Sequence, residues 1–142
     1  MSKIAIVYWS GTGNTETMAK QIAQGVQDAG AEAVLFSAAD FTPDMVSNFH
    51  RLAFGCPSMG DEVLEESEFE PMFSAVEPQL AGKAIALFGS FGWGDGQWMR
   101  DWQGRCSAAG ITILGGEGLI QNDAPDQAGL EKCHALGKAL AQ

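Results

Sequence analysis

The chain has 142 residues, of which 46% are hydrophobic, so residues 1–142 are expected to form one domain around a core of their own. Eighteen acidic and eight basic residues give a net charge of −10, which argues against nucleic acids and anionic membranes as partners. No stretch approaches the roughly 20 apolar residues of a membrane span, and no signal-peptide pattern opens the chain. Three cysteines without a C-x-x-C pair favour a cytoplasmic location, and two histidines far apart in the sequence argue against a zinc site.

Apolar runs typical of buried strands alternate along the chain with helical patterns. The expected strands are residues 4–9, 33–36, 52–56, 84–88 and 111–114. The expected helices are one after the first strand that ends near Gly30, a short one that Thr42 opens, and residues 66–76, 97–109 and 124–141. Because five continuous apolar strands alternate with five helices, we expect an α/β, doubly wound fold with helices on both faces of a five-stranded parallel sheet.

The turn after the first strand, Ser10-Gly11-Thr12-Gly13-Asn14-Thr15, predicts an anion site. Its glycines let backbone N–H groups converge, and the following helix adds the positive end of its dipole. It is not a dinucleotide fingerprint, because Glu16 stands where the third glycine belongs, and it is not a P-loop, because no lysine occurs before Lys20 except Lys3. The alternative is a tight turn with a Thr or Asn N-cap.

Two later loops belong to the same edge of the predicted sheet, because ligands of such folds bind outside the carboxyl ends of the strands. The loop after the fourth strand presents Trp93 between glycines, which suits a planar ligand stacked on the indole. The loop after the third strand adds the polarizable thioether of Met59. Trp98 and Trp102 have helical spacing, and we expect them to pack on the sheet. Together with the anion site, these loops predict a phosphorylated planar heterocycle as the ligand.

Residues 61–70 contain six acidic side chains, and no Lys or Arg occurs between Arg51 and Lys83. One interpretation is a solvated helix start, since acidic residues suit helix N-termini. The other is a surface that steers a basic protein partner. The sequence alone does not choose between the two.

The hexapeptide at 10–15, the sequence at 59–62 and the sequence Gly92-Trp93-Gly94 together resemble flavodoxins of the short-chain bacterial type. The resemblance covers essentially the whole chain. Too few residues separate Leu114 from Leu119 for the insertion that marks long-chain members. The resemblance implies the strand order 2-1-3-4-5 with FMN at the switch point, an order for which flavodoxin is itself the standard example.

The resemblance also implies how FMN is held. Its phosphate would lie in residues 10–15 and its isoalloxazine ring between Met59 and Trp93. The Gly60 carbonyl would accept a hydrogen bond from flavin N5–H, which stabilises the neutral semiquinone, and Glu62 would accept from N3–H. Backbone N–H groups of the 92–94 loop would bind the pyrimidine oxygen, and Asn122 would reach the ribityl chain. The residues expected at FMN are Ser10, Gly11, Thr12, Gly13, Asn14, Thr15, Pro57, Ser58, Met59, Gly60, Asp61, Glu62, Ser90, Phe91, Gly92, Trp93, Gly94, Gln97 and Asn122.

What the resemblance implies for function is a low-potential one-electron carrier that shuttles mainly between semiquinone and hydroquinone. Such a carrier needs no catalytic acid, base or nucleophile, because the cofactor supplies the electron chemistry. The expected partners are redox proteins with basic docking patches, such as reductases, dehydrogenases or hydrogenases, and the chain is expected to be a monomer. Since no basic residue lies in the three loops, we expect that neutralising Glu62, Glu65 and Glu66 would raise the second reduction potential.

Three other functions fit the sequence less well. A quinone or FMN reductase on the same fold would need a nicotinamide site, usually with a basic residue, and no basic cluster lies near these loops. A signalling receiver domain would need an aspartate where Cys56 stands and acids where Ser10 stands. A Cys-x5-Arg phosphatase would need an arginine at Glu62.

Overall fold

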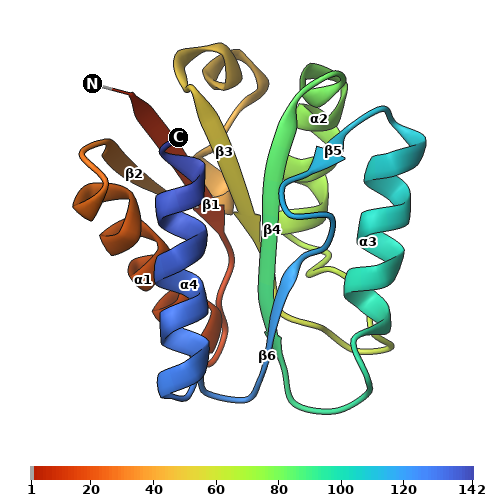
Figure 1. The fold of residues 1–142 in the computed structure, drawn as a ribbon. Coiled ribbons are helices and arrows are strands. Elements are labelled where there is room, and N and C mark those ends of the chain that lie inside the picture. The colour runs from red at the N-terminus through yellow and green to blue at the C-terminus, as the bar shows by residue number, and fades with distance from the viewer. Residues whose placement is uncertain (1) are drawn as a thin grey trace.

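A parallel sheet forms the middle layer of the computed structural model, which describes residues 2–142 (Figure 1). The strands run in the order β2-β1-β3-β4-β5, and β6 also pairs with β4, so the expected order is confirmed. The bounds are β1 Lys3–Tyr8, β2 Glu32–Ser37, β3 Arg51–Gly55, β4 Ala84–Phe91, β5 Thr112–Ile113 and β6 Leu119–Asn122. The strand order reverses between β1 and β3. After β1 the chain continues into a helix on one face of the sheet, and after β3 it continues to a helix on the other face, so the two connections diverge and leave room for a ligand.

The fifth position of the sheet differs from the prediction, because two short strands occupy it instead of one. β5 pairs with Ala84–Ile85 at the start of β4, and β6 pairs with Phe88–Phe91 at its end. Between them the chain leaves the sheet through Gly115 and Gly116, whose φ angles of +82° and +89° are left-handed. The described residues therefore form six strands where five were expected.

Helices cover both faces of the sheet, as predicted. The α-helices are α1 Asn14–Asp28, α2 Phe69–Leu80, α3 Gln97–Ala108 and α4 Gln127–Leu140. Figure 1 shows α1 and α4 on one face and α2 and α3 on the other. The helix expected after Thr42 is instead a 3₁₀ helix, η2 Pro43–Asn48, preceded by η1 Ala38–Asp40. The Thr42 hydroxyl donates to the Asp44 carboxylate and does not cap the backbone.

Two hydrophobic clusters fill the space between the sheet and its helices. Trp98 and Trp102 of α3 are only 1% and 2% exposed and belong to one of these clusters, so their predicted packing on the sheet is confirmed. On the other face, α1 and α4 pack closely enough that a Cβ atom at Gly25 would lie 2.0 Å from the carbonyl oxygen of His134. Gly30 follows the C-cap of α1 with a left-handed φ of +89°, in the role that the sequence predicts.

The three cysteine side chains are shielded from solvent. Cys56, Cys106 and Cys133 are free and buried, and burial raises their thiol pKa values to about 12, 11 and 11. Within residues 2–142, no three His, Cys, Asp or Glu side chains gather closely enough to hold a metal ion. No helix in the same range is long and apolar enough to cross a bilayer.

Candidate functional site

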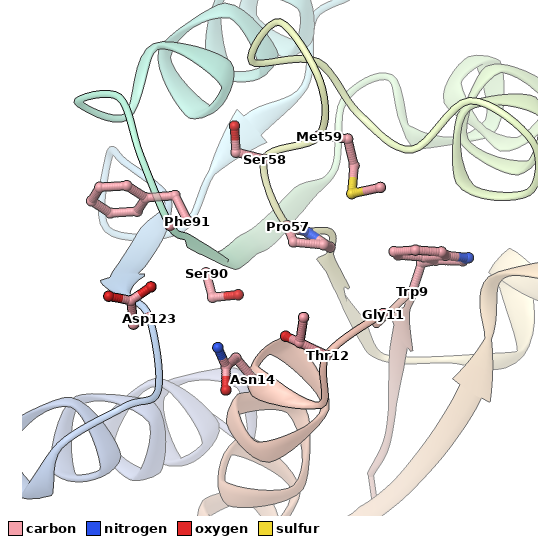
Figure 2. Close-up of a pocket in the computed structure, with 11 residues that line it drawn as sticks. Trp9, Gly11, Thr12, Asn14, Pro57, Ser58, Met59, Ser90, Phe91 and Asp123 are labelled. Carbon is pink, nitrogen blue, oxygen red and sulfur yellow. The ribbon is translucent and has the colours of Figure 1, made fainter.

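A hollow of about 220 Å³, called the main hollow below, opens at the carboxyl ends of β1, β3 and β4 (Figure 2). It is lined by Trp9, Gly11, Thr12, Asn14, Pro57, Ser58, Met59, Ser90, Phe91, Gly92 and Asp123. A second hollow of about 450 Å³ shares Trp9, Gly11 and Thr12 with the first and extends along the other side of the first loop. The three loops that the sequence singles out thus meet at one edge of the sheet.

The first loop presents backbone donors to this edge. Gly13 is the N-cap of α1 with a left-handed φ of +99°, so the Thr or Asn cap of the alternative interpretation is not formed. The Ser10 hydroxyl takes the capping role and accepts from the N–H groups of Gly13 and Glu16, both at 3.2 Å. Within residues 2–142, the N–H groups of Gly11, Thr12, Asn14 and Thr15 have no protein acceptor. Unpaired donors at the positive end of a fifteen-residue helix form an anion site.

Thr15 and Ser90 are the two most enclosed hydroxyls of the predicted set, 1% and 5% exposed. Their oxygens lie 3.1 Å apart, and the Ser90 N–H donates to the Thr15 hydroxyl at 3.3 Å. The pair ties the start of α1 to the end of β4 and so fixes the first loop against the fourth strand. The structure therefore gives Thr15 a positioning role, which the sequence did not indicate.

The second loop turns back on itself. Met59 and Val63 exchange two backbone hydrogen bonds of 2.9 Å, so residues 60–62 form the tip of a tight hairpin. Gly60 and Glu62 both have left-handed backbones, with φ angles of +48° and +56°. Gly60 adopts this conformation without a side chain, whereas Glu62 is a strained exception. Gly60 and Asp61 do not line the main hollow but border a neighbouring depression with Met59.

The Glu62 side chain joins the second loop to the third. Its Oε1 accepts from the backbone N–H of Gln97 at 3.1 Å, at the start of α3. It also lies so close to Gly94 that a Cβ atom there would be 2.6 Å from the same oxygen. The φ of +84° at Gly94 favours glycine there, and a side chain would also displace the Glu62 carboxylate. The carboxylate for which the resemblance implies a bond to flavin N3–H accepts a hydrogen bond from the protein in this structure.

The third loop carries Trp93, the aromatic residue that is predicted to stack on the ligand, in an exposed position. Trp93 is 59% exposed and does not line the main hollow, although its neighbours Phe91 and Gly92 do. A tryptophan in this position has an uncovered face that a planar ligand would bury. Asn122 is exposed and donates to the Phe91 carbonyl at 3.3 Å, so it braces the loop from β6.

Two lining residues were missed by the sequence analysis. Trp9 was counted as the last residue of the first strand, although β1 ends at Tyr8 and Trp9 borders both hollows. Asp123 follows the predicted Asn122 directly and lines the main hollow from the end of β6 (Figure 2). Its left-handed φ of +56° marks the place where the strand ends. An aromatic residue directly before the glycine loop was the available signal for Trp9.

The acidic residues of the segment 61–70 differ in their burial and in their hydrogen bonds. Glu65 is only 6% exposed, and its carboxylate accepts from the backbone N–H groups of Ser67, Glu68 and Phe69 at 2.8–2.9 Å. Burial opposes its ionisation, but these bonds and one from the Ser67 hydroxyl hold its pKa below the usual value. Glu70 likewise has a lowered pKa, because partial burial is outweighed by hydrogen bonds from Arg105 and Ser74. The exposed acidic residues of this segment are Asp61, Glu66 and Glu68.

A phosphorylated planar ligand fits what this edge offers. The first loop supplies unpaired N–H groups, the Thr12 hydroxyl and the Asn14 amide. The Ser58 hydroxyl is buried and has no partner within residues 2–142, so a polar ligand would satisfy it. The Met59 thioether borders the hollow, and the exposed indole of Trp93 belongs to the residue directly after Gly92, which also lines the hollow. The donor set lacks any cation, so an anion at this edge would be held by dipoles alone.

Comparison with known proteins identifies the arrangement. A family model described as flavodoxin matches residues 6–137. The flavodoxin of Clostridium beijerinckii is 46% identical over 136 residues, which cover 96% of this chain and 97% of that protein. The flavodoxin of Megasphaera elsdenii is 45% identical over 139 residues, 98% of each chain. The solution structure of its two-electron-reduced form has a TM-score of 0.89 with this fold at 44% identity, over 97% of this chain and 98% of that one. The chain therefore belongs to the flavodoxins, the FMN-binding family of low-potential electron carriers.

Proposed function

We propose that the three loops at the carboxyl edge hold the FMN with which this flavodoxin carries single electrons between redox proteins. The observation that carries the proposal is the group of unpaired N–H donors at residues 11, 12, 14 and 15, beside a hollow that the other two loops close. The phosphate would bind these donors together with the side chains of Thr12 and Asn14. Thr15 and Ser90 would support the loop from beneath through their mutual hydrogen bond.

The remaining loops are proposed to hold the ring system. Met59 would pack against its inner face and Trp93 against its outer face, where the indole is now exposed to solvent. The Gly60 carbonyl is the proposed acceptor for the proton on flavin N5. Because residue 60 has no side chain, its peptide can turn without a steric penalty. The Glu62 carboxylate is the proposed acceptor for flavin N3–H, which it can serve through Oε2 while Oε1 keeps Gln97.

FMN supplies the one-electron chemistry, and the chain supplies the position and the electric field. The carboxylates around the second loop disfavour further negative charge on a bound ligand, while the amide donors favour it. The acidic surroundings thus support the low potential of the carrier. Glu65 differs from its neighbours in this respect, because its charge is already balanced by three backbone donors.

We further propose that the protein turns over no substrate of its own. The three thiols are buried with raised pKa values, and no histidine lines either hollow at the first loop. Family membership is consistent with electron transfer but leaves the absence of catalysis to experiment. Mixing the FMN-loaded protein with NADPH should leave the flavin absorption unchanged on the time scale of a reductase turnover, and rapid bleaching would contradict the proposal.

The binding proposal is tested by reconstitution and a charge placed in the anion site. Wild-type apoprotein should bind FMN in a 1:1 ratio, become yellow and take up two electrons in separate steps on dithionite titration. Thr12→Asp should weaken FMN binding by about 100-fold or more, since it sets a carboxylate among the phosphate donors. Ser47→Asp, which places the same charge at an exposed hydroxyl position that lines neither hollow, is the matched control and should bind FMN within about threefold of wild type. A colourless protein that refuses FMN would overturn the assignment.

The partners are proposed to be redox proteins that dock basic patches on the exposed acids of the second loop, and the chain is proposed to act as a monomer in the cytoplasm. Asp61 and Glu66 are the acids to test, because both are exposed and neither contacts another side chain in an ion pair within residues 2–142. Electron transfer to a basic acceptor such as cytochrome c should slow at least threefold between 0.02 and 0.2 M salt, as roughly expected for steered association. The double variant Asp61→Asn/Glu66→Gln should lose most of this salt dependence. Rates that ignore salt would contradict the docking proposal.

A further inference from the structure

Trp9 connects the first loop with the second. It borders both hollows, as does Gly11 of the first loop. Figure 2 shows the two residues at the first of these hollows. A Cβ atom at Gly11 would lie 3.1 and 3.2 Å from Cη2 and Cζ3 of the indole, so ring and loop backbone are in tight contact. The backbone that carries the anion donors rests against the indole, so the position of these donors depends on the position of the ring.

The indole is itself held by Glu68. Its Nε1–H donates to Oε1 of Glu68 at 3.0 Å, across 59 residues of sequence. Glu68 is the N-cap residue of α2, yet its side chain makes no capping bond. Glu65 accepts the N–H groups of Glu68 and Phe69 instead, which fixes the Glu68 backbone and leaves its carboxylate for Trp9.

We infer that Glu68 is a positioning residue for the phosphate loop, which it steadies by holding the Trp9 indole against Gly11. This inference rests on the proposed FMN site. It makes a prediction opposite to that of simple electrostatics: Glu68 lines the same hollow as residues 10–13, so its charge should repel a phosphate. If Glu68 acted through its charge alone, removing it would strengthen binding. If it acts through Trp9, removing the acceptor weakens binding.

The test compares three variants by titrating each apoprotein with FMN and with riboflavin, which lacks the phosphate. Glu68→Ala should weaken FMN binding about fivefold, the effect of one charge-assisted hydrogen bond, and riboflavin binding less than about twofold. Glu68→Gln keeps an acceptor oxygen and should bind FMN as tightly as wild type or more tightly. Glu66→Ala, an exposed acid two residues away, is the control for lost charge and should not weaken FMN binding. A general loss of protein stability would weaken the binding of FMN and the binding of riboflavin to the same extent.

A second measurement works without the flavin, so that it stays valid if FMN binding itself fails. The indole ¹⁵N–¹H resonance of Trp9, identified by its absence in Trp9→Phe, should move in Glu68→Ala and not in Glu66→Ala. Titration with inorganic phosphate, followed on the amide resonances of residues 10–15, should show weaker binding in Glu68→Ala alone. The inference is wrong if Glu68→Ala binds FMN and phosphate at least as tightly as wild type, or if Glu68→Gln loses as much as Glu68→Ala.

Discussion

Replacing Gly137 by alanine is expected to destabilise the folded chain by about 2–4 kcal/mol, one of the largest effects available from a single methyl group. A Cβ atom at this position of α4 would lie 2.0 Å from the carbonyl oxygen of Ile22 and 3.0 Å from the Cα of Gly25 in α1. These neighbours are backbone atoms and cannot rotate away. The two helices must therefore separate, which opens the hydrophobic cluster beneath them.

Gly104→Ala is the matched control for this prediction. Gly104 lies inside α3, is exposed, and a Cβ atom there would meet nothing within 4 Å. Alanine is the better helix former by about 1 kcal/mol, so this variant should be more stable than wild type. Urea unfolding of the two apoproteins, followed by circular dichroism, measures both free energies. Equal stability of Gly137→Ala and wild type would show that the helices separate at little cost.

Most of the fold could be predicted from the sequence because β1 to β4 are continuous apolar runs and the α-helices have their own periodicity. The fifth strand position could not, because the pairing of Leu119–Asn122 with β4 depends on a partner that is distant in sequence. Leu119 and Ile120 form too short an apolar run to be recognised as a strand alone. The 3₁₀ character of η2 was hidden for a related reason: proline at its start fits either helix type.

The candidate site was predictable where a loop's own composition carries the chemistry, as in residues 10–15 and around Trp93. It was not predictable where one side chain serves a distant backbone. Glu65 had the appearance of one more solvated acid, yet it is buried and binds three N–H groups of its own loop. Glu62, Glu65 and Glu66 therefore do not share one environment, because within residues 2–142 only Glu66 is exposed and accepts no hydrogen bond from the backbone. Their common effect on the second reduction potential stays a prediction.

Glu65→Gln is expected to destabilise the apoprotein by about 2–3 kcal/mol and to loosen the second loop. Glutamine has one oxygen and one NH₂ group, so at least one of the N–H groups of Ser67, Glu68 and Phe69 would face a donor instead of an acceptor. The backbone N–H of Glu65 also donates to the Cys56 sulfur at 3.3 Å, which anchors the loop to the end of β3. Hydrogen exchange at residues 67–69 should rise in this variant. Glu66→Gln makes the same change of charge on an exposed neighbour and should leave both stability and exchange unchanged.

The dependence of this effect on pH separates a buried carboxylate cap from a simple packing role. The pKa of Glu65 is lowered in the folded chain, so its ionised form stabilises the fold at every pH above the unfolded value of about 4.3. As the pH falls below that value and through the lower folded pKa, this stabilisation is lost. The difference in unfolding free energy between wild type and Glu65→Gln should thus be constant from neutral pH down to about 5 and shrink at more acid pH. A difference that stays constant below pH 4 would show that the carboxylate charge contributes nothing, and that Glu65 acts through its shape alone.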